Sequence, residues 1–224
     1  IYHMINFDIT FIRNIPLFKK ISGEDFTKIW SIISPVIKTY NRNEIITMQG
    51  EEVRNLGILK EGTVFAAKYH YDGSTQLLKL LQPPDILGLE SVSSSFCTSP
   101  CTLTAGEYCS VVFFSYDRLI NSEGLSSETE KTLMQNIVNI LSDENIRSMY
   151  KIDVLSKRTL RERITTHLSI ISEKRNSRSF DIGMNQEQFA QYLCVNRSVL
   201  SNELNKMRKE GLIDFHKSFF TIYD

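Results

Sequence analysis

The chain is 224 residues long and carries 26 basic and 26 acidic side chains, so its formal net charge is zero. Its hydrophobic fraction of 42% excludes global disorder, and four cysteines are too few for a disulfide scaffold. No apolar run is long enough to span a membrane and no secretory signal is recognisable, so we expect a cytoplasmic protein of one large or two small domains. Averaged over the whole chain, zero net charge argues against a nucleic-acid partner.

The N-terminal segment, residues 5–35, has the spacing of helices. Apolar side chains recur every three or four residues, and Ser22 followed by two acidic residues is typical of a helix start. We expect Met4 to be the natural start, so no function is assigned to the three residues before it.

The pattern changes to short strands between residues 36 and 114. Runs rich in β-branched and aromatic residues alternate with glycine and proline turns, which is typical of an all-β sandwich or barrel. Asp72 and Gly73 form a hairpin signal between two of these runs. The predicted strands are 44–47, 56–59, 63–71, 76–81 and 109–114.

A long helix is predicted over residues 126–155. One set of its residues follows the alternating four-and-three spacing of a coiled-coil seam, and Ile137 and Ile140 fall on another face that is free to pack on the β domain. The spacing alone fits two alternatives, a dimer seam and an amphipathic helix packed within one chain. The seam residues are Met134, Val138, Leu141, Asn145, Ser148, Ile152 and Leu155.

The last segment, residues 156–224, contains three helical patterns and a β-like hairpin. A helix around Ala190 is followed by a tight turn and by a second helix around Leu204, and the small alanine allows the two helices to cross closely. Val195 and Val199 are predicted to fill the corner between them. This arrangement is a helix-turn-helix, in which the second helix enters the major groove of DNA.

The start of the second helix carries side chains suited to base edges. Arg197 can pair bidentately with guanine and Asn202 with adenine, while Ser198 and Ser201 are short donors or acceptors. A structural hairpin with a solvated polar face is the alternative, but the glycine and the hairpin that follow favour a winged DNA-binding domain. The predicted phosphate contacts are Lys206, Arg208, Lys209 and Lys217.

The sequence resembles the CRP/FNR superfamily of bacterial transcription regulators along nearly its full length. The shared features follow the family's order, and the C-terminal match is the more specific. They are the segments 15–18, 50–51, 60–62 and 83–88, the long helix, and the winged helix-turn-helix with Arg197 and Ser198.

The resemblance implies an α+β fold in three parts. These are an N-terminal β-roll of the cyclic-nucleotide-binding jelly-roll type (1–124), a dimerisation helix (125–155) and a winged helix-turn-helix (156–224). It also implies a homodimer on a partly palindromic double-stranded operator, with RNA polymerase as a partner if the protein is an activator. An effector pocket in the β-roll would be coupled to DNA binding through the long helix.

The effector is not expected to be cyclic AMP. The resemblance implies that a glutamate and, about ten residues later, an arginine hold the ribose and the phosphate in cyclic-nucleotide-binding members. Here the acid, Glu90, is displaced by one position, which in a strand would turn it to the other face, and 96–102 contain no basic residue. The predicted pocket residues are Gly88, Leu89, Glu90, Ser99 and Cys101.

The cysteines give three alternatives: structural thiols, a redox switch or a metal site. Cys97, Cys101 and Cys109 are close in sequence, but no histidine lies near them, so no metal or other cofactor is predicted. Cys194 is read as a small buried thiol in the helix-turn-helix corner. A thiol-redox or ligand-binding module with a vestigial DNA-binding domain therefore remains the alternative function.

Catalysis is not expected, because the four histidines lie in separate segments and no nucleotide-binding glycine motif is present.

The distribution of charge along the chain removes the objection to a nucleic-acid partner. Residues 1–124 carry 11 basic and 13 acidic side chains, 125–155 carry 3 and 5, and 156–224 carry 12 and 8. The positive charge therefore lies in the predicted DNA-binding domain.

Overall fold

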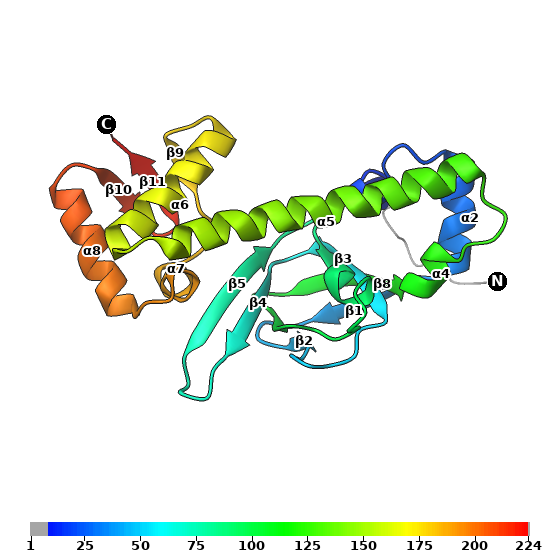
Figure 1. Cartoon of the computed structure of the whole chain (residues 1–224), viewed down its shortest axis with the longest axis horizontal. Coiled ribbons are helices and arrows are strands. Elements are labelled where there is room, and N and C mark those ends of the chain that lie inside the picture. Colours follow the sequence, from blue (N-terminus) through cyan, green and yellow to red (C-terminus); the bar gives the residue numbers. More distant parts are fainter. Residues whose placement is uncertain (1–8, 224) are drawn as a thin grey trace.

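The computed structural model describes residues 9–223 and contains two domains joined by one long helix (Figure 1). His3 and the expected start at Met4 lie outside the described residues. Among residues 9–223 no helix is long and apolar enough to cross a membrane.

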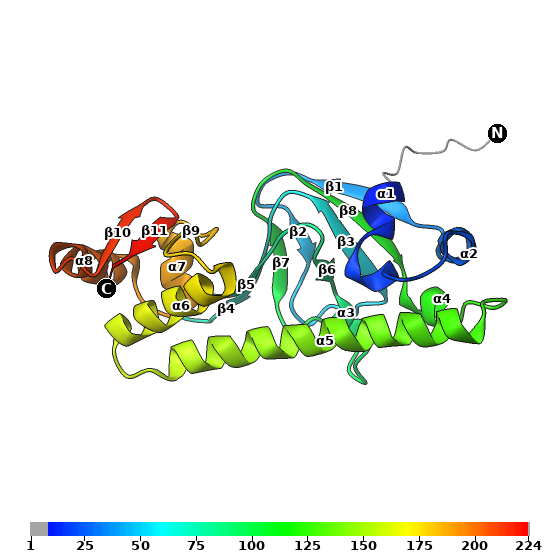
Figure 2. The same cartoon turned by 90° about the horizontal axis from the view of Figure 1, so that it is seen from above.

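The N-terminal domain is a β-roll of two antiparallel four-stranded sheets, in the orders β1-β8-β3-β6 and β2-β7-β4-β5. Small helices pack at one end of the roll (Figure 2). Its strands are β1 (Val36–Tyr40), β2 (Ile45–Thr47), β3 (Asn55–Glu61), β4 (Val64–Tyr69), β5 (Thr75–Leu81), β6 (Ile86–Leu87), β7 (Thr102–Ala105) and β8 (Cys109–Ser115). Its helices are α1 (Ile9–Arg13), the 3-10 helix Pro16–Phe18, α2 (Gly23–Ile33), α3 (Leu89–Val92) and α4 (Tyr116–Ile120).

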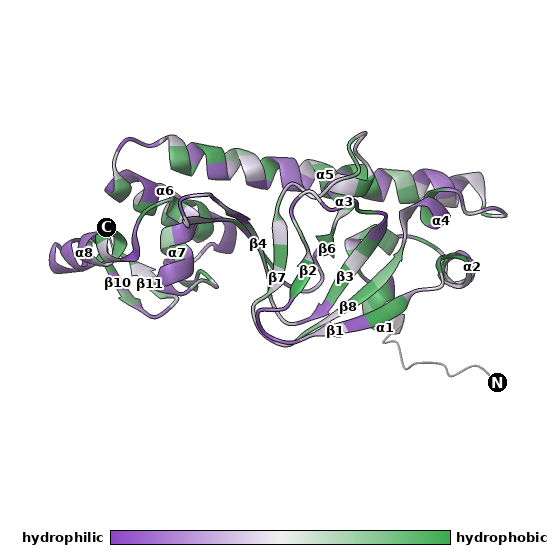
Figure 3. Ribbon diagram, turned by 90° about the horizontal axis from the view of Figure 1, so that it is seen from below, coloured by the Kyte–Doolittle hydropathy of each residue, from purple (hydrophilic) through white to green (hydrophobic). Residues whose placement is uncertain are grey.

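The long helix α5 (Ser127–Ser156) confirms the predicted helix almost to the residue. Ser126 accepts a hydrogen bond from the backbone N–H of Thr129 and so caps the helix. Ile137 is buried in the β-roll core and Ile140 packs against that core, as predicted. Hydrophobic and hydrophilic residues alternate along α5 (Figure 3), and Val138, Met149 and Ile152 are exposed, so part of its apolar surface does not face the roll.

The C-terminal domain is a winged helix-turn-helix around its own hydrophobic core. The sheet order is β10-β11-β9, and β9 was not predicted because three residues give too short a pattern. Its elements are α6 (Leu160–Arg175), β9 (Ser179–Asp181), α7 (Gln186–Leu193), α8 (Arg197–Lys209), β10 (Ile213–His216) and β11 (Phe219–Ile222).

The two domains touch directly as well as through α5. Leu77 of β5 is 2% exposed and belongs to the hydrophobic core of the C-terminal domain, and α7 lies against β5. The predicted fold class is therefore confirmed, and a contact between the β-roll and the DNA-binding domain is added to it.

One buried amide ties α5 to the N-terminal helices. The Asn136 side chain is 8% exposed and donates to the backbone oxygens of Leu17 at 3.0 Å and Lys19 at 2.8 Å. We expect Asn136→Ala to lower the free energy of unfolding by about 1–3 kcal/mol, because it leaves these carbonyls without their donor. Urea denaturation measures this. Asn139→Ala, at an exposed position of the same helix, is the control; equal losses in the two variants would contradict the assignment.

Candidate functional site

The helix-turn-helix begins at a well-formed cap. Asn185 and Gln188 exchange side-chain and backbone hydrogen bonds at the start of α7, which is a capping box. Ala190 is 1% exposed where the two helices meet, as its size predicted. The turn places Cys194 in a left-handed conformation, and the Val195 N–H donates to the Ala190 oxygen at 3.0 Å. These contacts fix the angle at which α8 leaves the turn.

The first turns of α8 present the predicted base-reading residues to solvent. Arg197, Ser198 and Asn202 are exposed, and Ser201 is half-buried. The prediction for Val199 is wrong: it is 49% exposed and lies on the outer surface of α8, while Val195 is partly buried against the core. An apolar side chain beside Arg197 is available for contact with a thymine methyl group.

The predicted phosphate contacts divide into two groups. Lys206 and Lys209 are exposed on α8, and Lys217 is exposed in the wing turn with a φ of 55°. Arg208 instead holds the wing: its guanidinium pairs with Asp214 at 3.0 Å, donates to the backbone oxygen of Phe215 and lies 3.7 Å from the centre of that ring. Arg208 is therefore already engaged within the domain.

An ion-pair cluster that the sequence reasoning missed anchors α8 to α6. Arg161 Nε lies 2.6 Å from Glu203 Oε1, and its two terminal nitrogens bind both oxygens of Glu210 at 2.6 and 3.0 Å. These bonds raise the pKa of Arg161 and lower that of Glu210. The seven-residue spacing of the two glutamates, which places them on one face of α8, was the available signal.

A cavity of about 760 Å³ opens between the β-roll, α5 and the C-terminal domain. Its volume is in the range of small-ligand pockets. Four of the five predicted effector residues line it, namely Gly88, Glu90, Ser99 and Cys101. Leu89 does not, because it is 2% exposed and packs in the β-roll core.

The expectation that Glu90 faces away from the pocket is wrong. Residues 89–92 form the short helix α3 instead of a strand, so the one-position displacement does not invert the side chain. Glu90 pairs with Lys79, whose Nζ also lies 2.9 Å from Glu144 Oε2 on α5. Arg147 pairs in turn with Glu144 at 2.9 Å. The charges at this end of the cavity are thus mutually neutralised.

The opposite end of the cavity is built differently, from α5, α6 and α7. Lys151 Nζ donates to the Leu77 oxygen at 2.5 Å and lies 3.4 Å from the centre of the Tyr192 ring. Burial lowers the pKa of Lys151 to about 7 and raises that of Tyr192 to about 12. His167 is 8% exposed, its Nε2 has no hydrogen-bond partner in the part of the chain described, and burial lowers its pKa to about 3.

The cysteines do not gather. Cys101 and Cys109 are buried, and burial raises the pKa of both thiols, which disfavours the reactive thiolate. Cys194 is exposed, contrary to the prediction, and accepts a hydrogen bond from Gln76 of the β-roll at 3.4 Å. Within residues 9–223 no group of three or more candidate metal-binding side chains lies together.

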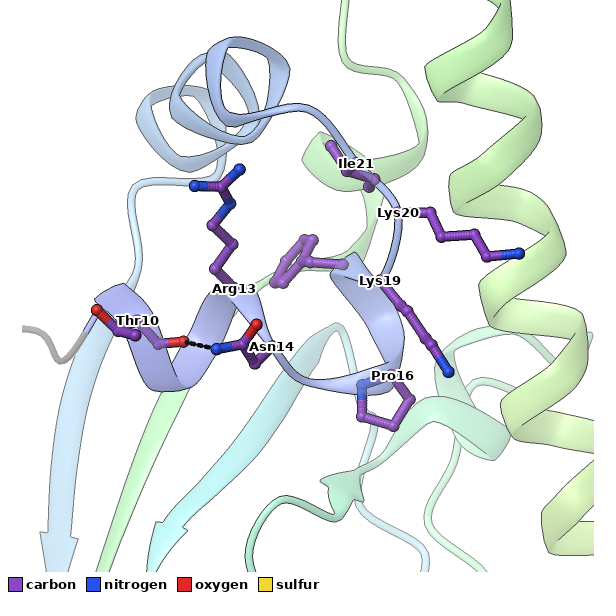
Figure 4. Close-up of a pocket in the computed structure, with 8 residues that line it drawn as sticks. Thr10, Arg13, Asn14, Pro16, Lys19, Lys20 and Ile21 are labelled. Carbon is purple, nitrogen blue, oxygen red and sulfur yellow. Dashed lines mark hydrogen bonds between the residues drawn. The ribbon is translucent and has the colours of Figure 1, made fainter.

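Two smaller hollows lie at the far end of the molecule. One of about 590 Å³ is formed by the N-terminal helices, and Lys19 and Lys20 extend from it toward α5 (Figure 4). These lysines also line the second hollow, with α5. Arg13 completes a basic surface, but none of these side chains is buried, so the hollows show no built site.

The predicted dimer seam lies on the surface of α5. Val138 is 53% exposed and Ile152 67% exposed, while Leu141 is half-buried. Met134, Asn145 and Ser148 are also exposed, and Leu155 is half-buried. A row of large apolar side chains that the single chain leaves in solvent is what an interface requires.

Comparison with known proteins agrees with this geometry. A cyclic nucleotide-binding domain matches residues 37–121 and a Crp-like helix-turn-helix domain matches 162–224. The chain belongs to the CRP/FNR superfamily of DNA-binding transcription regulators. Electron transport regulator A of Shewanella oneidensis is 23% identical over 193 residues, which are 84% of this chain and 74% of that protein.

Solved structures show the same fold. The c-di-GMP-responsive global regulator CLP of Xanthomonas campestris has a TM-score of 0.72 at 16% identity, covering 91% of this chain and all of that one. A mutant of CooA from Carboxydothermus hydrogenoformans has a TM-score of 0.71 at 19% identity, covering 87% and 86%. This CRP/FNR regulator therefore combines an effector-type domain with a DNA-binding domain.

Burial of His167 makes stability depend on pH. The folded state binds no proton at His167 until about pH 3, whereas the unfolded chain binds one near pH 6.5, so acidification favours unfolding between these values. His167→Leu should reduce the loss of stability between about pH 6 and 5 by up to about 1.4 kcal/mol per pH unit. Chemical denaturation at each pH measures the slope. His216→Leu, an exposed position in the same domain, should keep the wild-type slope, and an unchanged slope in His167→Leu would refute the assignment.

Proposed function

We propose that this CRP/FNR regulator acts in the cytoplasm as a homodimer that reads a partly palindromic operator through α8, without catalytic activity of its own. The observation that carries the proposal is the surface of α8, where Arg197, Ser198 and Asn202 are exposed on a helix held by a buried core and by Arg161. Lys206 and Lys209 supply positive charge along the same helix for phosphates. RNA polymerase would be the further partner of an activator.

The homodimer is supported by the surface of α5. The seam predicted from the heptad spacing is mostly exposed, and Asn145, a polar seam residue, would fix the register of two parallel helices. Asn145, Ser148 and Ile152 also line the large cavity. A second α5 laid on the seam would therefore close one wall of that cavity.

The effector is proposed to be a small molecule other than cyclic AMP, bound in the cavity between the β-roll and α5. Residues 96–102 place no arginine or lysine there, and both Lys79 and Arg147 are already paired with carboxylates. A cyclic phosphate at the β-roll end of the cavity would therefore lack a free guanidinium. The thiol-redox alternative is not favoured at Cys101 and Cys109, because these thiols are buried and their pKa values are raised, while Cys97 is half-buried and Cys194 exposed.

Base recognition is tested by Arg197→Ala. An operator is first selected from a random double-stranded DNA pool. The variant should lose about 1–3 kcal/mol of operator binding and discriminate less between bases at one position of each half-site, because one bidentate guanine contact is removed. Titration by fluorescence anisotropy measures the affinity. Arg42→Ala, an exposed arginine of the β-roll, is the control; an Arg197→Ala variant with full affinity and selectivity would disprove the role of α8.

Dimerisation is tested at the seam with Val138→Glu and Ile152→Glu. Either substitution places a carboxylate in the predicted interface, where like charges from two chains would face each other. Sedimentation equilibrium should show the wild type as a dimer and both variants as monomers, with operator affinity lowered in parallel. Asn139→Glu adds the same charge next to the seam and should remain dimeric. A dimer in both seam variants would place the interface elsewhere.

A further inference from the structure

The large cavity is electrostatically asymmetric. At the β-roll end, Lys79 and Arg147 are paired with carboxylates. At the end between α5, α6 and α7, Lys151 and Lys174 also line the cavity, but neither has a carboxylate partner among residues 9–223. Positive charge at this end is therefore not neutralised within the described chain.

Lys151 is the less usual of the two lysines, because it is half-buried at the contact between the domains. An ammonium has three N–H donors. One binds the Leu77 oxygen, and the face of Tyr192 receives the positive charge without accepting a full hydrogen bond. A half-buried ammonium with so few partners is costly, in keeping with the pKa of about 7 that burial gives Lys151, and an anion beside it would favour the charged form.

The second lysine lies at the open side of the same end. Lys174 of α6 is exposed and its Nζ lies 4.0 Å from the centre of the Tyr150 ring of α5. Two tyrosine faces thus hold the two lysines at the wall of the cavity. Apolar side chains from Leu80, Leu155, Ile170 and Ile171 also line the cavity, together with the imidazole of His167.

We propose that this end of the cavity binds an amphipathic organic anion, whose charged group lies at Lys151 and Lys174 and whose apolar body lies along Leu80 and Ile171. The assignment of this anion as the effector rests on the proposed function. A ligand placed there would touch β5, α5, α6 and α7 together, so its binding energy would depend on how the two domains sit against each other. The predicted pocket residues of the β-roll, such as Glu90 and Ser99, would contact the other end of the ligand or none of it.

The test uses 8-anilino-1-naphthalenesulfonate as the anionic probe and N-phenyl-1-naphthylamine, which lacks the sulfonate, as the neutral probe. Fluorescence titration of the full chain should show tighter binding of the anionic probe. Lys151→Met should weaken the sulfonate by about tenfold or more, since a charge-assisted hydrogen bond is lost, and leave the neutral probe unchanged. Lys174→Met, at an exposed position, should weaken binding of the sulfonate in the same direction.

Lys38→Met is the matched control, because Lys38 also lies over an aromatic ring, that of Phe113, but outside the cavity. It should bind both probes like the wild type. Unchanged sulfonate binding in both cavity variants, or equal binding of the two probes by the wild type, overturns the anion site.

Operator binding without any probe separates this proposal from the proposed function. If the chain binds the sulfonate through its lysines but binds no selected DNA, the anion site is supported and the proposed reading of an operator by α8 is overturned. A chain that binds the operator through Arg197 while its cavity variants keep the sulfonate overturns the anion site alone.

Discussion

The structure depends on one helix being part of two hydrophobic cores. Near its start, α5 buries Leu133 and Ile137 in the β-roll core, and near its end it buries Val154 in the core of the DNA-binding domain. A helix of 30 residues is about 45 Å long and keeps its backbone hydrogen bonds internal. Neither core can rotate about α5 without repacking its contacts with the helix.

The second contact between the domains is smaller and chemically unlike the first. Leu77 of β5 enters the core of the DNA-binding domain, and Lys151 binds the Leu77 carbonyl from α5. The half-buried ammonium of Lys151 makes this contact costlier than the purely apolar packing along α5. A movement between the domains would therefore begin at β5 and α7, with α5 retained.

The sequence predicted the helices, the turn and the strands that have a local periodic pattern. The spacing of residues 126–155 predicted α5, the turn around Cys194 predicted the helix-turn-helix, and most strands were placed to within two residues. Contacts between distant segments were not visible. Glu90 was misjudged because a four-residue helix has no readable period, and the bonds of Arg161 to α8 join residues more than forty positions apart. The ion pairs around Lys79 and the direct contact between the two domains form only where distant segments such as β5, α5 and α6 meet.

Zero net charge is consistent with DNA binding once its distribution is known. The acidic excess lies in the first 155 residues and the basic excess in the last 69. In the fold, α8 lies at the opposite end of α5 from α2 and α4 (Figure 1). At about 8 Å, the screening length in physiological salt is short compared with the roughly 45 Å helix, so charges at its far end barely affect the attraction of Lys206 and Lys209 for phosphates. Attraction to DNA therefore depends on the surface of one domain, and a movement at the junction can redirect that surface without changing its charge.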